Sequence, residues 1–207
     1  MSIKSIIKFN SKEMVKELKE HEGVKLNDKG QIISYWDGPE DGAKDHRERN
    51  LTTGYGHLVK FKENEDGTFT NIDPVKDING KPITKEGQVL SNSVAEDLFT
   101  KDYIFHLKET VKLPHFKDVD KSRQMSLMNY TFNMGPAWQK KFKNAISNFN
   151  VAVTSQDPIV KNNAWYMMGQ EMLKKDGTDP NSLPSKYIKD TKGRGKFVTE
   201  RLVRGDG

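Results

Sequence analysis

The sequence has no cysteine among its 207 residues and no long apolar run. Disulfide bonds and catalysis by a thiol are therefore excluded. No segment approaches the roughly 20 apolar residues that a transmembrane helix needs. The first residues, MSIKSIIKF, are too short and too interrupted by lysine to form a secretory signal peptide. We therefore expect a chain that is made in a cytoplasm, does not insert stably into a membrane, and needs outside help for any export.

Composition limits the class of protein further. Apolar residues make up 34% of the chain and charged residues 30%, while the aromatic content of 9% is too high for a disordered chain. The net charge of +5 favours an anionic partner, such as nucleic acid, membrane headgroups or bacterial wall polymer. The basic residues are dispersed among 29 acidic ones, which is more typical of a solvated surface than of a nucleic-acid interface.

The first part of the chain predicts one helix followed by a small sheet. Segment 10–23 has Asn10 as a suitable N-cap, Glu13 in the position that completes a capping box, and Gly23 as a C-terminal stop. From 24 to 90, glycines separate short apolar and β-branched runs, as in a small antiparallel sheet with loops.

Particular loops follow from the same region. The Asp-Gly pair in NEDGTF (64–69) predicts a hairpin, INGKPIT (78–84) predicts a turn, and GPEDGAKDHRERN (38–50) predicts a polar loop. We expect the long hairpin region 59–90 on the outer edge of the sheet lobe, where it could bind a partner.

The rest of the chain is predicted to be helical. Helical patterns occupy 94–111, with Ser91 or Ser93 as the cap, then 123–135, 137–150, 157–177 and 193–205. Together these patterns predict an α+β fold in one domain, 1–207. Its expected parts are a sheet lobe at about 11–90, an inter-lobe helix at about 92–110, and a helical lobe at about 111–207 that packs with the N-terminal helix. A ligand is expected in a cleft between the lobes.

The stretch LTTGYGHL (51–58) is open to several chemical readings. It lacks the Lys-Ser/Thr pair and the following helix of a phosphate-binding loop. The histidines are not spaced as a zinc site requires, so no metal is expected. The tripeptide RGD (204–206) is short enough to occur by chance. What remains is a tight turn that presents a hydroxyl or an imidazole.

Two carboxylates stand out. Glu22 continues the apolar face of the first helix, four residues after Leu18 and eight after Met14, although a frayed last turn would give the same spacing. Asp37 follows a strand, where a carboxylate stays hydrated. Desolvation would raise the pKa of Glu22, and two carboxylates in unlike surroundings are the arrangement that glycoside hydrolysis uses.

These blocks resemble a known family. EHEGVKL, YWDG and LTTGYGHL, in this order, are similar to the signature of the T-even phage-type lysozymes, glycoside hydrolase family 24. SRQMSLMNYTFNMG, AEDLFTKD and the closing segment SKYIKDTKGRGKFVTERLVRGD are similar to later parts of the family, so the resemblance covers about residues 12–206. Fragments YWD, SRQM and TKGR resemble most the tail-associated lysozyme of the phage baseplate hub.

The resemblance implies a muramidase that needs no metal or organic cofactor. Glu22 would be the general acid, Asp37 would position or activate water, and Thr52 would hold that water by its hydroxyl. Thr53 is the rival hydroxyl, because successive strand residues face opposite sides and only one of the two can enter the site. Gly54 and Gly56 would allow a close backbone approach to the sugar or a kinked strand.

Further residues match the family by position. Leu58, Phe132 and Asn133 match positions that contact the glycan, although a core role fits Phe132 equally well. His57 would pair with Asp102 and tie the sheet to a helix. Arg194 would approach Glu22 and bridge the lobes. Both catalytic spacings are longer than in the family, each being 15 residues since 37 − 22 = 15 and 52 − 37 = 15.

The expected partner is bacterial peptidoglycan, with no nucleic acid. A free endolysin would be a monomer made in the host cytoplasm and acting in the periplasm, whereas a virion-tail lysozyme would bind other phage tail proteins. Two rivals stay open from the sequence: a wall-binding or tail structural module without turnover, and a lytic transglycosylase that uses one glutamate.

Overall fold

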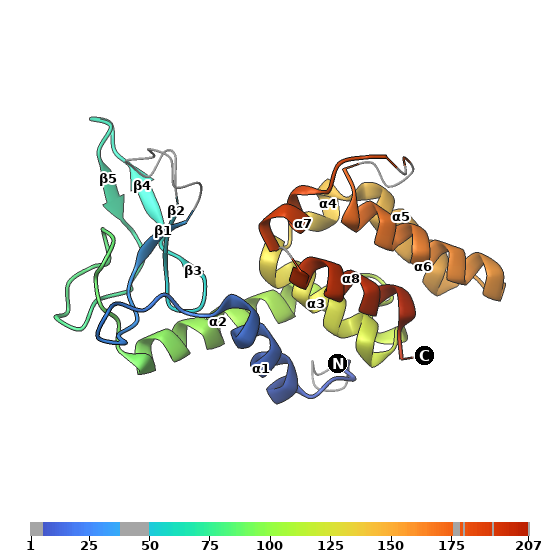
Figure 1. Ribbon diagram of the computed structural model, residues 1–207, viewed down its shortest axis with the longest axis horizontal. Coiled ribbons are helices and arrows are strands. Elements are labelled where there is room, and N and C mark those ends of the chain that lie inside the picture. Colours follow the sequence, from blue (N-terminus) through green and yellow to red (C-terminus); the bar gives the residue numbers. More distant parts are fainter. Residues whose placement is uncertain (1–5, 38–49, 176–178, 180, 192, 207) are drawn as a thin grey trace. The chain divides into compact units, whose positions relative to one another are not determined.

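The computed structural model describes residues 6–37, 50–175, 179, 181–191 and 193–206. The polar loop predicted at 38–50 lies outside these residues except for Asn50. Two compact units make up the chain: Met1–Leu18 with Tyr103–Gly207, and Lys19–Asp102. The strands lie in the second unit and helices form the first, which confirms the α+β fold class (Figure 1). The single-domain interpretation and its lobe boundaries stay predictions.

The bounds of the elements follow the sequence patterns closely. The helices are α1 (Ser11–Glu22), α2 (Asn92–Thr110), α3 (Lys121–Met134), α4 (Trp138–Lys141), α5 (Lys143–Thr154), α6 (Pro158–Leu173), α7 (Lys186–Thr191) and α8 (Gly193–Arg204), with a 3-10 turn, η2, at Phe116–Asp118. The strands are β1 (Tyr35–Asp37), β2 (Asn50–Thr53), β3 (His57–Leu58), β4 (Phe61–Glu63) and β5 (Phe69–Asn71). Within the described part of the chain, no helix has the length and apolar content to cross a membrane.

Helix α1 forms where its signals predict. The side chain of Asn10 accepts a hydrogen bond from the backbone N–H of Lys12 at 2.9 Å, which satisfies one free donor of the first turn. Gly23 follows the last helical residue, as expected. The carboxylate of Glu13, expected to complete the capping box, instead forms a 2.8 Å ion pair with Lys121 of α3.

The predicted sheet is in fact two sheets. Strands β1, β2 and β3 form one antiparallel sheet in that order, and β4 and β5 form a separate antiparallel pair. The hairpin predicted at 64–69 is the β4–β5 connection, closed by a hydrogen bond from Gly67 N–H to the carbonyl of Asn64 at 3.0 Å. The turn at Asp77–Lys81 uses the same geometry, which confirms the predicted turn.

The long segment 59–90 is more than an outer edge. The core of this unit consists of Ile32, Leu51, Val59, Val75, Ile83, Leu90, Ala95 and Leu98. Four of these residues come from 59–90, so part of this segment belongs to the core, while its expected position on the outer edge of the sheet lobe stays a prediction. Because strands this short bury little surface, the turns between them must supply apolar side chains to the core.

Helix α3 is the centre of the helical unit. Its residues from Gln124 to Thr131 are all buried, as the apolar pattern predicts, and it packs against α4 and α8. Helices α5 and α6 pack side by side, and α6 also contacts α8 (Figure 1). Gly135 ends α3, as expected.

The segment 137–150, predicted as one helix, is two. The break falls at Phe142, whose φ of −102° and ψ of 60° leave the helical region. It allows α4 to bury Trp138, whose indole N–H donates to the hydroxyl of Thr131 at 3.0 Å, while α5 buries Ala145 and Phe149. Periodicity did not separate these two helices, and the short helix α7 was also missed.

The RGD sequence has a structural use. Asp206 accepts hydrogen bonds from the backbone N–H groups of Lys121 at 3.0 Å and Ser122 at 2.9 Å. A hydrogen bond from the Ser122 side chain is the largest cause that lowers the pKa of Asp206. The two backbone hydrogen bonds lower this pKa further. The carboxylate therefore caps the N-terminus of α3 in addition to the cap made by Asp120.

We predict that Asp157→Ala lowers the free energy of unfolding by about 1 kcal/mol. The Asp157 side chain accepts from the N–H groups of Ile159 at 2.8 Å and Val160 at 3.3 Å, so alanine leaves both donors without a cap. Urea unfolding measures the loss. Asp157→Asn keeps the accepting oxygen and should change little, and equal stability of the wild type and Asp157→Ala would contradict the prediction.

Candidate functional site

One face of the three-stranded sheet gathers predicted site residues. Tyr35 lies opposite Thr52, Asp37 lies opposite Asn50, and Thr52 lies opposite Leu58 on its other side. Side chains that face each other across strands lie on one face of a sheet, and so do residues two apart on one strand. Tyr35, Asp37, Thr52 and Leu58 therefore share a face, on which Asp37 and Leu58 are exposed.

The other face of the sheet belongs to the core. Leu51 is 1% exposed and is a member of the apolar cluster of this unit. Thr53, opposite His57, is completely buried on this side. The register thus puts the hydroxyl of Thr52, and not that of Thr53, on the face that carries Asp37.

The carboxylate of Glu22 reaches the turn between β2 and β3. Gly56 in this turn has a φ of +81°, and a Cβ built on it would lie 3.2 Å from Glu22 Oε2. An L side chain here would be strained and would push against the carboxylate. The close approach expected of this glycine is therefore, in the structure, an approach to Glu22.

The residue between the two glycines fastens the turn. The hydroxyl of Tyr55 donates to Glu96 of α2 at 3.1 Å, and Glu96 also pairs with Lys19 near the end of α1. The Lys19 ammonium lies 5.1 Å from the ring centroids of both Tyr55 and Phe99, at cation–π distance. These contacts tie α1, the turn and α2 together beside Glu22.

Tyr35 lies opposite Thr52 and on the face that carries Asp37. Burial raises the pKa of its phenol, and the negative charges of Asp37 and Glu22 raise it further. Both carboxylates thus act on one side chain, and Thr52 is its partner across the strands. Tyr35 was not predicted as a site residue. The signal for it is its spacing, because residues two apart on a strand, such as Tyr35 and Asp37, lie on the same face.

His57 makes the contact that the resemblance implies and a second one that was missed. Its Nδ1 lies 2.7 Å from Asp102 Oδ2, and its Nε2 lies 3.1 Å from Asp73 Oδ2. Burial of the ring lowers the pKa of His57, but the hydrogen bonds and charges of Asp102 and Asp73 outweigh it, so the pKa is raised overall. The Asp73 side chain is 4% exposed. No motif identified Asp73, because it lies in segment 59–90, outside the motifs.

Three predicted site residues belong to the helical unit. Asn133 accepts a hydrogen bond from the Arg194 guanidinium through its Oδ1 atom. Phe132 is partly buried, with its ring centroid 5.2 Å from that of His106. The approach of Arg194 to Glu22 and the cleft between the lobes stay predictions.

Comparison with known proteins gives a distant likeness. No family model matches the chain. A curated relative from Dictyostelium discoideum, named "Probable T4-type lysozyme 2", is 25% identical over 139 residues, which cover 65% of this chain and 82% of the relative. The chain is similar to a T4-type lysozyme. The likeness agrees with the α+β fold and with the lysozyme resemblance of the sequence motifs.

The phenol of Tyr35 provides a probe of this candidate site that does not depend on activity. We predict that Asp37→Asn and Glu22→Gln each lower the pKa of Tyr35, because each removes a negative charge that disfavours the phenolate. NMR titration of tyrosine labelled at the ring Cζ measures it, with Tyr35→Phe to assign the signal. An unchanged Tyr35 titration in both variants would contradict the arrangement of these three groups.

The histidine pairing predicts a pH dependence of stability. The folded-state pKa of His57 is raised above its ordinary value of 6.5, so the stabilisation is complete below about pH 6.5 and is lost as pH rises through the folded value. The difference in unfolding free energy between the wild type and His57→Gln should shrink over that window in urea unfolding. Asp73→Asn should move the folded pKa of His57 back toward 6.5, and a pH-independent difference would contradict the pairing.

Proposed function

We propose that the protein is a muramidase that hydrolyses the β-1,4 bond between N-acetylmuramic acid and N-acetylglucosamine in bacterial peptidoglycan. The observation that carries this proposal is that Asp37 and Thr52 share one face of the sheet, while the carboxylate of Glu22 lies at the turn between β2 and β3. The relative named as a probable T4-type lysozyme supports it. A pair of carboxyl groups is what most glycoside hydrolases use to break a glycosidic bond.

The position of Glu22 supports a catalytic role over a structural one. A carboxylate in the last turn of a helix faces the negative end of the helix dipole, which is unfavourable for helix stability. Glycine at position 56, with its positive φ, leaves room for this carboxylate. Charged groups in unfavourable surroundings are typical of functional sites. The placement of Glu22 at a helix end and against a turn therefore favours a catalytic role.

In the proposed reaction Glu22 is the general acid. It gives its proton to the glycosidic oxygen as the bond from this oxygen to the anomeric carbon breaks. A water held by the Thr52 hydroxyl attacks the anomeric carbon, and Asp37 takes the proton that this water loses. The products are two shorter glycans, one with a new reducing end, and the elements of one water molecule have been added.

The surroundings of Leu58 support glycan binding. Leu58 is 47% exposed on the face of Asp37 and Thr52. A hollow of about 270 Å³ lies beside it and is lined also by Asn50, Leu51, Val59, Lys60, Phe61 and Phe69, so it adjoins the face of Asp37 and Thr52 through Leu58 and Asn50. Apolar and aromatic side chains next to polar ones are usual in sites that bind sugars and other small ligands. Phe132 is the other proposed glycan contact, and Asn133 and Arg194 are further proposed site residues.

The proposal includes a phage origin, either as a free endolysin that acts in the periplasm or as a lysozyme of the virion tail that binds other tail proteins. The basic net charge of +5 suits an anionic wall. Probing purified phage particles for the chain distinguishes the two forms.

We predict that Glu22→Gln lowers the rate of wall-suspension clearing by roughly 100-fold to 10,000-fold, the usual contribution of a general acid. Asp37→Asn and Thr52→Val should also lose most of the activity. Thr53→Val is the matched control, because Thr53 is buried on the other face and valine fills the same space.

Two outcomes would overturn the proposal. Equal clearing by the wild type and Glu22→Gln would remove the mechanism, and absence of clearing by the folded wild type would favour a wall-binding module. Mass spectrometry of the products tests the reaction type, since hydrolysis gives reducing ends and a lytic transglycosylase gives anhydro sugars without added water.

A further inference from the structure

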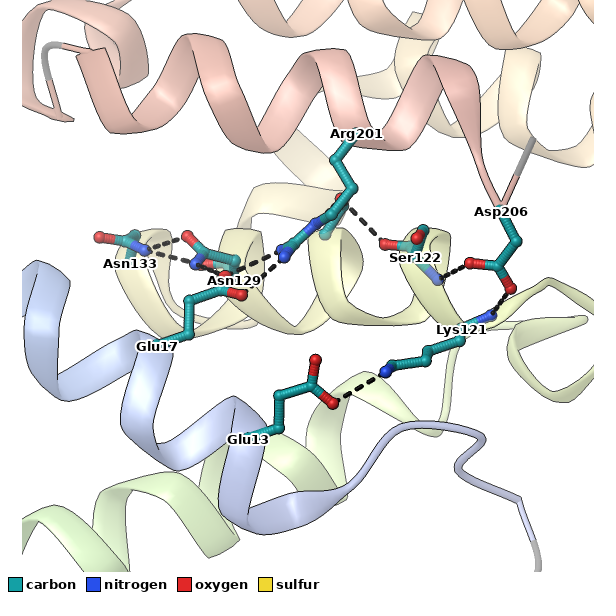
Figure 2. Close-up of polar contacts among 9 residues, drawn as sticks. Glu13, Glu17, Lys121, Ser122, Asn129, Asn133, Arg201 and Asp206 are labelled. Carbon is teal, nitrogen blue, oxygen red and sulfur yellow. Dashed lines mark hydrogen bonds and ion pairs between the residues drawn. The ribbon is translucent and has the colours of Figure 1, made fainter.

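A partly buried ion pair joins α1 to α8 in the helical unit. Arg201 donates to Glu17 through both of its terminal nitrogens, Nη1 to Oε2 at 2.6 Å and Nη2 to Oε1 at 3.0 Å (Figure 2). The side chains are only 13% and 17% exposed, and Arg201 Nε donates to the hydroxyl of Ser126 at 3.0 Å. This two-pronged geometry fixes the orientation of the Glu17 carboxylate.

A chain of side-chain amides starts at this carboxylate. Asn129 of α3, which is completely buried, donates from Nδ2 to Glu17 Oε1 at 3.3 Å. Its Oδ1 accepts from Asn133 Nδ2 at 2.8 Å, one helical turn later (Figure 2). Asn133 Oδ1 in turn accepts from Nη2 of Arg194. We refer to Glu17, Asn129, Asn133 and Arg194 as the relay.

The two ends of the relay fix its direction. An ionised carboxylate can only accept hydrogen bonds and a guanidinium can only donate them. Asn129 must therefore turn its NH₂ group toward Glu17 and its oxygen toward Asn133. Asn133 must likewise turn its NH₂ group toward Asn129 and its oxygen toward Arg194.

The same geometry leaves Asn133 no free hydrogen. Its NH₂ group donates both to Asn129 Oδ1 and to the backbone carbonyl of Asn129, each at 2.8 Å. An amide with both hydrogens engaged cannot donate to a sugar. A direct donor role of Asn133 toward the glycan is therefore disfavoured, and a role through Arg194 is favoured.

We propose that Glu17 is a positioning residue for glycan hydrolysis, which acts through Asn129 and Asn133 to hold the Arg194 guanidinium in one orientation. This inference rests on the proposed function, in which Arg194 is a site residue. Replacement of a buried ion pair by apolar residues of similar volume is often neutral or stabilising, so stability is a weak reason for such a pair. The contacts indicate another role for the Glu17–Arg201 pair, which is to orient the side-chain amides of Asn129 and Asn133.

The test compares the double variant Glu17→Leu/Arg201→Met with Asn129→Ala and with the control Glu13→Gln. The double variant removes the acceptor at the end of the relay without leaving a buried charge unpaired. Glu13 also lies on α1 and pairs with a residue of α3, Lys121, but its side chain is 48% exposed and lies outside the relay (Figure 2).

Two readouts are measured on each folded variant. The first is the side-chain amide signals of Asn133 in ¹H–¹⁵N NMR, with their hydrogen-exchange rates, and the second is kcat and KM on a soluble glycan oligomer. We expect the double variant to keep the wild-type unfolding midpoint, to shift the Asn133 signals and to speed their exchange. We expect kcat to fall roughly tenfold, within the about 100-fold that a 1 Å misplacement can cost, with KM within about twofold of the wild type. Glu13→Gln should change neither readout.

Non-additivity separates the relay from general loosening. Asn129→Ala should match the double variant, and adding it to the double variant should lower kcat no further, because the relay is already broken. Unchanged Asn133 signals in the folded double variant and in Asn129→Ala would overturn the relay, as would additive losses of kcat. If the wild type shows no hydrolysis, the proposed function fails, while the NMR readout still decides whether Glu17 orients Asn133.

Discussion

The register of β2 between β1 and β3 is the constraint on which the candidate site depends. It sets Thr52 opposite Tyr35 and Leu58, and so on the face of Asp37. A slip by one residue would turn Thr53 to that face and expose Leu51, which is 1% exposed in the core. Burial of Leu51 therefore holds the register, and the register gathers the polar groups of the site.

Two of the four glutamates of helix α1, Glu17 and Glu22, have different surroundings. Glu17 receives the Arg201 guanidinium and the Asn129 amide, so its charge is balanced by fixed donors. Glu22, in the last turn, lies against the backbone of Gly56 and acts on the phenol of Tyr35. The Glu17 carboxylate is therefore fixed by hydrogen-bond donors, whereas the Glu22 carboxylate lies at the turn where we propose that the chemistry occurs.

The long segment 59–90 is part of the core of its unit. Segment 59–90 supplies Val75 and Ile83 to the core and Asp73 to the ring of His57. The pairing of His57 with a second buried carboxylate raises its pKa, so this unit acquires a pH-dependent contact that the motif alone did not predict. Lengthening a loop costs little free energy of loop closure, and its apolar residues stabilise the fold once they are buried.

The sequence by itself determined the order of most elements, the two ends of α1, the glycine that ends α3, the β4–β5 hairpin, and the residue types of the site, because these depend on neighbours a few positions apart. Tertiary structure alone decided the break at Phe142, the second partner of His57, and the relay from Glu17 to Arg194. The second contact of His57 and two of the three relay contacts join residues separated by 16 to 112 positions along the chain, as in His57–Asp73 and Glu17–Asn129. No local pattern of charge or hydrophobicity encodes such a contact, since it exists only after distant side chains are buried together and must satisfy one another's hydrogen bonds.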